Sequence, residues 1–275
     1  MSEANDREHK MIDIGILGAD GRMGQAVITA MQGRANLAAA LTAPNSPNIG
    51  TDASGLAGLN PSGVVLSSDI KAGLNACDVI IDFSRPQAAI DCVLAMHGTR
   101  CKAFVTGTTG YTETEEKALM EAGDNITLLK SGNFSLGVNL LEALVEQAAR
   151  ALKTDWDIEI SEQHHKHKVD APSGTALMLG EAAAKGRGGK LRDMRANMRE
   201  GVDAAREQGH IGFSAIRGGD IIGVHDVHFL NELEQITLSH RANNRSVFAS
   251  GAVTAALWAV KQSKGRYDMR DVLGL

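Results

Sequence analysis

The sequence contains few of the residues that characterise several classes of protein. Aromatic residues make up 4% of the 275 positions, and there are five prolines and three cysteines. The cysteines are Cys77, Cys92 and Cys101, an odd number without C-x-x-C spacing, each in or beside an apolar segment. This pattern excludes a disulfide-stabilised scaffold and indicates a reducing compartment.

A long hydrophobic run and a signal peptide are also missing. No apolar run approaches the roughly 18 residues needed to cross a bilayer, and residues 1–10 are polar, with charges of both signs. The net charge is −5, from 28 basic and 33 acidic residues. Such a charge gives no global attraction to nucleic acid or to an anionic membrane. We therefore expect a cytoplasmic protein with a small-molecule substrate and with neither a nucleic-acid nor a membrane partner.

Glycine, in contrast, is abundant. The chain has 30 glycines in 275 residues, about 11%, against a usual ~7%. Hydrophobic residues at 43% and charged residues at 22% are near globular averages, and the glycines follow no three-residue period. Neither disorder nor collagen explains the excess, which must be local. At ~100–200 residues per domain, the length fits one large domain or two modest ones.

The first half of the chain alternates strand-like and helix-like segments. Each strand-like run is short and apolar and ends at a glycine or at a polar turn, and most are followed by apolar residues at helical spacing. Such alternation predicts a parallel sheet with helices on both faces, that is, a Rossmann-like, doubly wound α/β domain. The expected strands are 11–17, 37–41, 78–82, 103–106 and 126–129, the expected helices are 23–31, 88–96 and 112–123, and residues 44–60 are expected to form a long loop.

After about residue 133 the pattern changes. A long amphipathic segment, 136–152, precedes residues 156–163, in which apolar and polar residues alternate as in a sheet with one covered face. Three more strand-like runs follow, and residues 218–220 predict a hairpin turn between the first two. This half predicts an α+β domain with a mixed or antiparallel sheet. The expected domains are a dinucleotide-binding domain over 1–134, completed by 245–275, and a substrate-binding and oligomerisation domain over 135–244.

Three glycines, Gly18, Gly21 and Gly24, follow the first expected strand and open a helix. Glycine permits a tight turn and lets a pyrophosphate approach backbone N–H groups, and a helix N-terminus adds donors and partial positive charge. The spacing is G-x-x-G-x-x-G instead of the commoner G-x-G-x-x-G. Its position between a strand and a helix favours a dinucleotide site over an ordinary turn.

The residues after the second expected strand leave the choice between NADH and NADPH open. An acid ~20 residues beyond the glycines usually holds the adenosine ribose, or a nearby arginine accepts a 2′-phosphate. Here Thr42 and Ala43 supply neither group. Asp52 lies beyond a proline-interrupted loop and is interpreted as a solvated aspartate. Arg22 could contact the phosphates, and a solvated arginine at a helix start is the alternative.

Residues 162–175 contain three of the nine histidines within four positions, together with two lysines. A metal site, a nucleic-acid patch, a solvated basic loop and an anion-binding acid–base site are the possible interpretations. The lysines would repel a divalent cation, and no aromatic residues are interleaved for nucleic acid. Histidine exchanges protons near neutral pH, lysine donates to carboxylates, and residues 173–175 open a helix whose N–H groups can hold a carboxylate. We favour hydride transfer to a small polycarboxylate, with no metal.

Six motifs along the chain belong together: GADGRMG at 18–24, DFSRP at 82–86, GTTG at 107–110, SGNFS at 131–135, HHKHKVDAPSGTA at 164–176 and RGGDIIGVH at 217–225. Together they resemble the 4-hydroxy-tetrahydrodipicolinate reductase family, also called dihydrodipicolinate reductase. The resemblance extends from about residue 11 to the C-terminus, and the histidine segment is specific to that family. It implies an NADH- or NADPH-dependent reductase of lysine biosynthesis through diaminopimelate, assembled as a homotetramer around its second domains.

The resemblance also implies residue roles. His164 would be a proton donor and acceptor and Lys168 the catalytic proton donor. His165 would contact the substrate, and the backbone of Gly174 and Thr175 would hold a substrate carboxylate. The implied cofactor-binding residues are Gly18, Ala19, Asp20, Gly21, Arg22 and Met23 at the pyrophosphate, Gly107, Thr108 and Thr109 near the nicotinamide ribose, and Ser131, Gly132, Asn133 and Phe134 at the carboxamide.

One departure concerns Thr42 and Ala43, where many members of the family carry a Glu-Arg pair. Without the carboxylate and without the arginine, we expect a weak preference between the two cofactors. His167 has no assigned role, and His225 and His228 are interpreted as sheet residues.

Two alternative functions come from other classes. An aspartate or homoserine dehydrogenase-like enzyme is disfavoured by the histidine–lysine segment. A dinucleotide-sensing regulator is disfavoured because neither end of the chain offers a basic or helix-turn-helix module.

Overall fold

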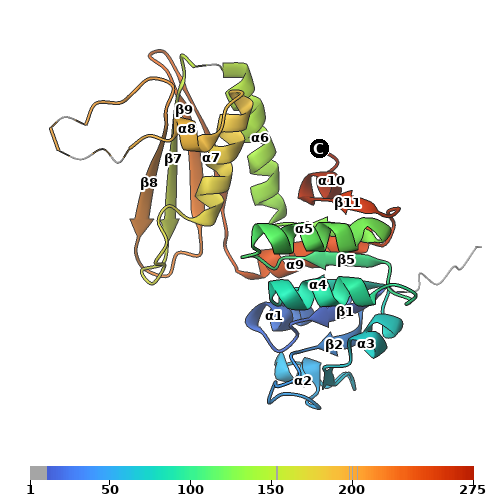
Figure 1. Cartoon of the computed structure of the whole chain (residues 1–275). Helices are drawn as coiled ribbons and strands as arrows, with labels where there is room; N and C mark the ends of the chain where they lie inside the picture. Colours follow the sequence, from blue (N-terminus) through green and yellow to red (C-terminus); the bar gives the residue numbers. More distant parts are fainter. Residues whose placement is uncertain (1–10, 153, 198, 200, 203) are drawn as a thin grey trace, which may run out of the picture. The chain divides into compact units, whose positions relative to one another are not determined.

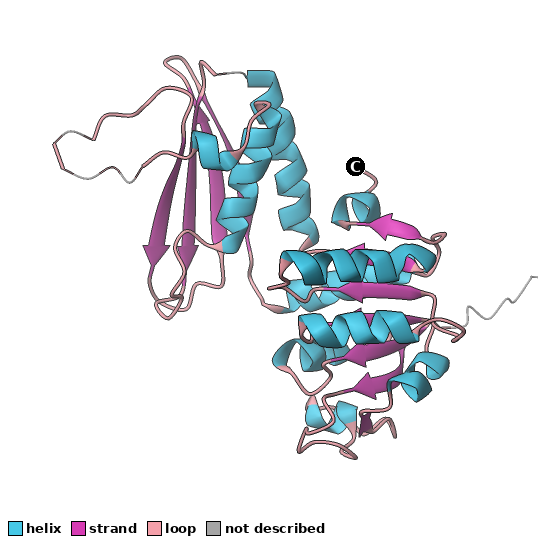
Figure 2. Cartoon of the chain, in the orientation of Figure 1, coloured by secondary structure: helices cyan, strands magenta, loops and turns pink. Residues whose placement is uncertain are grey.

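The computed structural model describes residues 11–152, 154–197, 199, 201–202 and 204–275. They form two compact units, which Figure 1 labels by element and Figure 2 colours by secondary structure. One unit consists of the described part of Met1–Phe134 together with Phe248–Val272, and the other consists mainly of Ser135–Val247. Among the described residues, no helix combines the length and the apolarity that a membrane span requires.

The first unit contains a seven-stranded parallel sheet in the order β11-β6-β5-β4-β1-β2-β3. The chain winds outward from β1 in both directions, so the expected Rossmann-like, doubly wound α/β class is confirmed. The strands are β1 (Asp13–Leu17), β2 (Asn36–Leu41), β3 (Leu66–Ser67), β4 (Val79–Asp82), β5 (Ala103–Thr106), β6 (Thr127–Lys130) and β11 (Gly265–Tyr267).

The helices of this unit begin at recognisable local signals. Pro86 is the first residue of α4, and Thr112 and Glu115 form a capping box at the start of α5. Asp52, expected to be solvated, caps α2 by accepting the Gly55 N–H at 2.8 Å. The helices are α1 (Arg22–Ala30), α2 (Ala53–Leu56), α3 (Ile70–Ala76), α4 (Pro86–Ala95), α5 (Glu113–Ala122), the 3-10 turn η1 (Gly123–Asn125), α9 (Ser246–Ala259) and α10 (Met269–Leu273).

Several short elements of this unit differ from the prediction. The predicted loop over 44–60 contains α2, and β3, α3, β11 and α10 were not predicted. Each has seven or fewer residues, too few for a hydrophobic period to repeat clearly.

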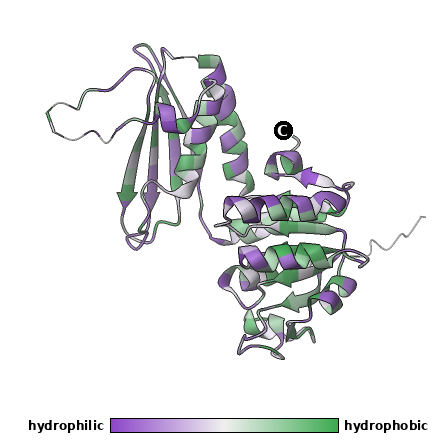
Figure 3. Ribbon diagram, viewed as in Figure 1, coloured by the Kyte–Doolittle hydropathy of each residue, from purple (hydrophilic) through white to green (hydrophobic). Residues whose placement is uncertain are grey.

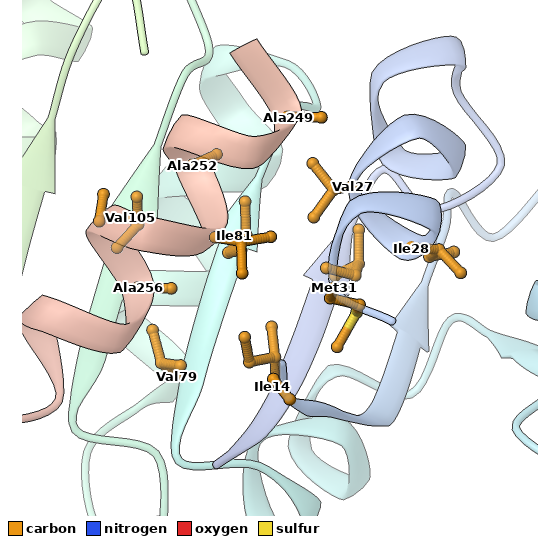
Figure 4. Close-up of a cluster of buried hydrophobic side chains, with 14 of the residues drawn as sticks. Ile14, Val27, Ile28, Met31, Val79, Ile81, Val105, Ala249, Ala252 and Ala256 are labelled. Carbon is orange, nitrogen blue, oxygen red and sulfur yellow. The ribbon is translucent and has the colours of Figure 1, made fainter. Parts of the chain in front are cut away.

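Hydrophobic layers cover both faces of the parallel sheet. Successive strand residues point to opposite faces, so Val79 and Ile81 join one buried cluster and Ile80 joins the other. Figure 4 shows the first cluster, in which Ala252 and Ala256 of α9 pack over β4 beside the α1 side chains. The strands are accordingly among the most hydrophobic parts of the unit (Figure 3). The cysteines Cys77, Cys92 and Cys101 are buried and free.

The second unit is a four-stranded sheet, ordered β10-β9-β7-β8, with helices on one face. β7 and β8 are parallel, whereas β7 and β9, and β9 and β10, are antiparallel. The expected α+β class with a mixed sheet is confirmed. The elements are α6 (Leu136–Leu152), β7 (Asp157–His164), α7 (Gly174–Gly186), α8 (Leu191–Met194), β8 (Ile211–Arg217), β9 (Val224–Leu230) and β10 (Gln235–Arg241).

The predicted hairpin at residues 218–220 is wrong. β8 and β9 do not pair with each other, because β7 lies between them. The turn residues bond instead to the chain leaving β7: the Gly218 N–H donates to the His164 carbonyl at 3.0 Å, and the Lys166 N–H donates to the Gly219 carbonyl at 3.2 Å. This connection brings residues 217–219 beside the histidine segment.

Candidate active site

The carboxyl ends of the central parallel strands lie level with one another. Leu17 pairs with Leu41 and with Asp82, and Asp82 in turn pairs with Thr106. The loops after β1, β2, β4 and β5 therefore leave the sheet at one edge, where ligands bind in open α/β sheets. The turns at 18–24 and 107–109, expected to bind a cofactor, are both at this edge.

The glycine loop after β1 fits a pyrophosphate. Gly18 has a φ of +82°, and the N–H groups of Gly18 and Ala19 donate to the Leu41 carbonyl at 2.9 and 3.0 Å. A Cβ on Gly24 would lie 2.2 Å from the Gly18 carbonyl oxygen, so a glycine there lets α1 pack directly on the loop. Gly21 is the N-cap of α1 and no side chain caps that helix. The N–H groups of its first turn can therefore bind an anion.

Asp82 connects two turns of this edge through its carboxylate. It accepts the Ser84 N–H at 2.9 Å and the hydroxyls of Thr106 and Thr108 at 2.7 and 2.9 Å. Burial raises the pKa of Asp82, despite these hydrogen bonds. Asp82 was not among the predicted site residues, although a carboxylate at the end of an otherwise apolar strand could have indicated it.

Phe83 contacts two further turns that were expected to bind the cofactor. A Cβ on Gly107 would lie 2.2 Å from Phe83 Cε1, so glycine is needed for the ring to pack against this turn. The Phe83 ring also meets the Phe134 ring edge to face, with centroids 5.8 Å apart. Phe83 thus brings the turn at 107–109 and the turn at 131–134 together.

In the second unit, a buried carboxylate lies at the centre of the histidine segment. Glu162, 1% exposed, lies 2.6 Å from Nδ1 of His164 and receives two hydrogen bonds from Arg217, at 2.6 and 2.7 Å. It also accepts the Ser173 N–H at 3.0 Å. Burial opposes its ionisation, but the hydrogen bonds from Arg217, His164 and Ser173 outweigh burial and hold the pKa of Glu162 below its usual value. Neither Glu162 nor Arg217 was predicted as a site residue.

His225 belongs to the same cluster. Its Nε2 lies 3.0 Å from Oγ of Ser173, and its ring meets the His164 ring edge to face with centroids 5.1 Å apart. Burial, followed by the nearby His164, lowers the pKa of His225 to about 4. His225 is therefore a sheet residue, as expected, that also contacts the predicted catalytic histidine. His228 lies on the other face of β9, between the hydroxyls of Ser161 and Thr237.

Lys168 and His165 lie in the turn that follows β7. Lys168 Nζ forms an ion pair with Asp170 at 2.9 Å, and the Lys168 N–H donates to the His165 carbonyl at 3.1 Å. Desolvation and then the nearby Arg245 lower the pKa of His165. The His167 ring lies 6.3 Å from that of His165. Two lysine side chains, Lys166 and Lys168, and two imidazoles therefore lie within residues 165–168.

The first turn of α7 is the remaining part of the candidate site in the second unit. Ser173 caps the helix by accepting the Ala176 N–H at 3.2 Å. A Cβ on Gly174 would meet no atom within 4 Å, so the backbone there is open to a ligand. Within the ranges that the structure describes, no three His, Cys, Asp or Glu side chains gather as metal ligands. The arrangement can bind a carboxylate and transfer a proton.

Comparison with known proteins covers almost the whole chain. Residues 12–134 match the family model for the dihydrodipicolinate reductase N-terminus, and residues 137–273 match the model for its C-terminus. The 4-hydroxy-tetrahydrodipicolinate reductase of Bartonella tribocorum is 48% identical over 264 residues, and that of Allorhizobium ampelinum is 50% identical over 264 residues. Both alignments cover 94% of this chain and 97% of the relative.

A solved structure has the same fold. Dipicolinate-bound dihydrodipicolinate reductase from Paenisporosarcina sp. TG-14 superposes with a TM-score of 0.75 at 24% identity, covering 94% of this chain and 97% of that one. The fold, the two family models and the near-full-length identities agree. The chain belongs to the dihydrodipicolinate reductase family.

Proposed function

We propose that this protein reduces 4-hydroxy-tetrahydrodipicolinate to tetrahydrodipicolinate with NADH or NADPH, in the biosynthesis of lysine through diaminopimelate. The single observation that carries this proposal is the cluster of buried Glu162 and His164 with half-buried Arg217 beside the open start of α7. This cluster places a histidine that can exchange protons beside backbone N–H groups that can bind a carboxylate. The reduction of a dicarboxylate requires both.

The dinucleotide would be held by residues 1–134, completed by residues 245–275. The nicotinamide of the bound dinucleotide would supply the hydride. The uncapped start of α1 and the glycine loop support pyrophosphate binding, and the Phe83 contacts support a common position for the two later turns. The proposed contact residues are Gly18, Ala19, Asp20, Gly21, Arg22, Met23, Gly107, Thr108, Thr109, Ser131, Gly132, Asn133 and Phe134.

The substrate would be held by residues 135–244. Gly174 and Thr175 bind one substrate carboxylate through the backbone at the start of α7, and His165 contacts the substrate. Lys168 donates the proton that accompanies hydride addition, and His164 relays or accepts a proton. The cationic lysine and the helix N-terminus both favour an anionic substrate.

Glu162 and Arg217 would prepare His164 for this role. The Glu162 carboxylate accepts a hydrogen bond from the Nδ1–H of His164, which fixes the tautomer and leaves Nε2 for proton exchange. A Cβ on Gly223 would lie 3.2 Å from Nε2, so the glycine keeps a side chain away from the reactive nitrogen. Arg217 keeps Glu162 anionic in a buried position where an unpaired carboxylate would be costly.

We further propose a cytoplasmic homotetramer assembled through the second unit. The polar face of its sheet supports an assembly role: Asp157, Glu159, Ser161 and Gln163 alternate with buried residues along β7. Light scattering coupled to size exclusion should give four times the mass of one chain, and a monomer would contradict this assembly.

The activity is tested by supplying freshly generated 4-hydroxy-tetrahydrodipicolinate and following loss of the reduced-nicotinamide absorbance, with NADH and NADPH in parallel. We expect substrate-dependent oxidation of at least one cofactor. Aspartate semialdehyde serves as the control substrate and should give none. Binding of a dinucleotide without turnover would instead support the sensing-regulator alternative.

A further inference from the structure

Asp20 extends from the glycine loop to the end of β2. Its Oδ2 accepts the Ser46 hydroxyl at 2.6 Å, and the side chains of Thr42 and Asn48 lie near enough to the carboxylate to lower its pKa. Ser46 is oriented in turn, since its Oγ accepts the Asn48 N–H at 3.2 Å. Through Ser46, the loop after β2 therefore holds a carboxylate that it does not itself contain.

This position is the one where dinucleotide-binding sheets commonly carry an acid. In such folds a carboxylate at the end of the second strand binds the adenosine ribose hydroxyls. Here β2 ends at Leu41, and Thr42 and Ala43 follow it without a carboxylate. Because Asp20 accepts the Ser46 hydroxyl from the loop that leaves β2, its carboxylate lies beside that loop although it comes from a different part of the chain. With Asp20 beside Thr42 and Ala43, a clear preference between the cofactors replaces the weak one expected from residues 42 and 43 alone.

The Asp20 carboxylate carries an uncompensated negative charge. Burial opposes its ionisation, but the hydrogen bonds from Ser46, Thr42 and Asn48 outweigh burial and lower the pKa of Asp20. Among the described residues, no ion pair joins Asp20 to a cationic side chain. The side chain is only partly buried, so a ligand can reach it. A ribose hydroxyl can donate to such a group, whereas a 2′-phosphate is repelled by it.

We propose that Asp20 binds the adenosine ribose hydroxyls and makes this enzyme prefer NADH over NADPH. The inference rests on the proposed dinucleotide site and adds its selectivity. Ser46, Thr42 and Asn48 are positioning residues, since they act through Asp20. One hydrogen bond to a charged group corresponds to roughly ten- to hundredfold in affinity.

The test measures the dissociation constants of NADH and NADPH by isothermal titration calorimetry, without substrate, for the full chain and three variants. Asp20→Asn keeps the size and polarity of the side chain but removes its charge. Ser46→Ala leaves the charge of Asp20 in place and removes a hydrogen bond that orients the Asp20 carboxylate. Asp91→Asn, on the exposed face of α4, removes one negative charge elsewhere.

We expect the unaltered protein to bind NADH at least tenfold more tightly than NADPH. Asp20→Asn should reduce this ratio about tenfold or more, Ser46→Ala should reduce it less, and Asp91→Asn should leave it unchanged. Equal or tighter binding of NADPH by the unaltered protein, or an unchanged ratio in Asp20→Asn with an unchanged melting temperature, would overturn the role of Asp20 while leaving the reductase function intact. Failure of both cofactors to bind would overturn the dinucleotide site and this inference with it.

Discussion

His164 Nδ1 lies 2.6 Å from Glu162 Oε2, on the same strand and two residues apart. Residues i and i+2 of a strand share a face, so the E-x-H spacing by itself places the two side chains together. The third partner, Arg217, comes from the last position of β8, which pairs with His164. The proposed acid–base histidine thus contacts a neighbour in sequence, Glu162, which is held in turn by a neighbour in space, Arg217.

Removal of the proposed proton donors should lower turnover. We expect Lys168→Ala and His164→Ala each to reduce kcat by ~10²–10⁴-fold, the range for a lost general acid or base. Steady-state kinetics at saturating cofactor measure this effect. Near-normal turnover in Lys168→Ala would refute its role, and His167→Ala serves as a control from the same segment.

Substitution of the carboxylate that orients His164 should act on kcat more than on KM. Glu162→Gln keeps the shape but removes the charge that Arg217 and His164 share, and we expect kcat to fall roughly 10–100-fold. Glu146→Gln is the matched control, since Glu146 is a buried carboxylate of α6 in the same unit and pairs with Arg150 and Lys185. A similar loss of kcat in both variants would indicate a general structural effect on the unit.

The buried carboxylate at the cofactor edge should support stability and the binding of both cofactors. Asp82→Ala leaves the donors of Ser84, Thr106 and Thr108 without their acceptor. We expect the free energy of unfolding to fall by about 2–4 kcal/mol. Affinity for NADH and NADPH should fall by similar factors, because the two cofactors differ only at the adenosine ribose. A changed NADH-to-NADPH ratio would contradict this general positioning role. Chemical denaturation and calorimetric titration provide the two measurements.

Two glycines in the later cofactor turns should respond differently to alanine. In Gly107→Ala the new Cβ would lie 2.2 Å from the Phe83 ring, which must move, whereas a Cβ at Gly132 meets nothing within 4 Å. Gly107→Ala should therefore lower stability by about 1–3 kcal/mol, the usual cost of overpacking. Gly132→Ala should leave the melting temperature unchanged and weaken dinucleotide binding if the turn contacts the carboxamide. Unchanged binding in Gly132→Ala would remove that contact from the proposed site.

Stability should depend on pH through His225. Its pKa is lowered from 6.5 to about 4, so between these values the unfolded chain binds a proton that the folded chain does not. Above pH 6.5 His225 is neutral in both states and does not lower the free energy of unfolding. As the pH falls from 6.5 towards 4, the free energy of unfolding decreases by at most about 1.4 kcal/mol per pH unit. Melting temperatures of His225→Gln should show a smaller decrease over this range. An identical decrease in both proteins would assign the pH dependence to other groups.

Local patterns in the sequence were enough to predict the principal strands and helices. The short apolar runs of β1, β4 and β5 end in polar turns, and the register of these strands places those turns at one edge, as crossover topology requires. The prediction of a hairpin after β8 was wrong because turn residues indicate where a chain reverses but not which strand it then pairs with. β7 lies between β8 and β9 and pairs with both of them.

The sequence by itself determined the fold class, the glycine loop, the histidine segment and the contact between Glu162 and His164, because each depends on residues close together along the chain. Only the tertiary structure brought Arg217 and His225 to that pair and placed the Asp20 carboxylate at the end of β2. These contacts join residues separated by 26 to 61 positions. Strand pairing and loop packing decide such contacts, and no short sequence motif encodes them.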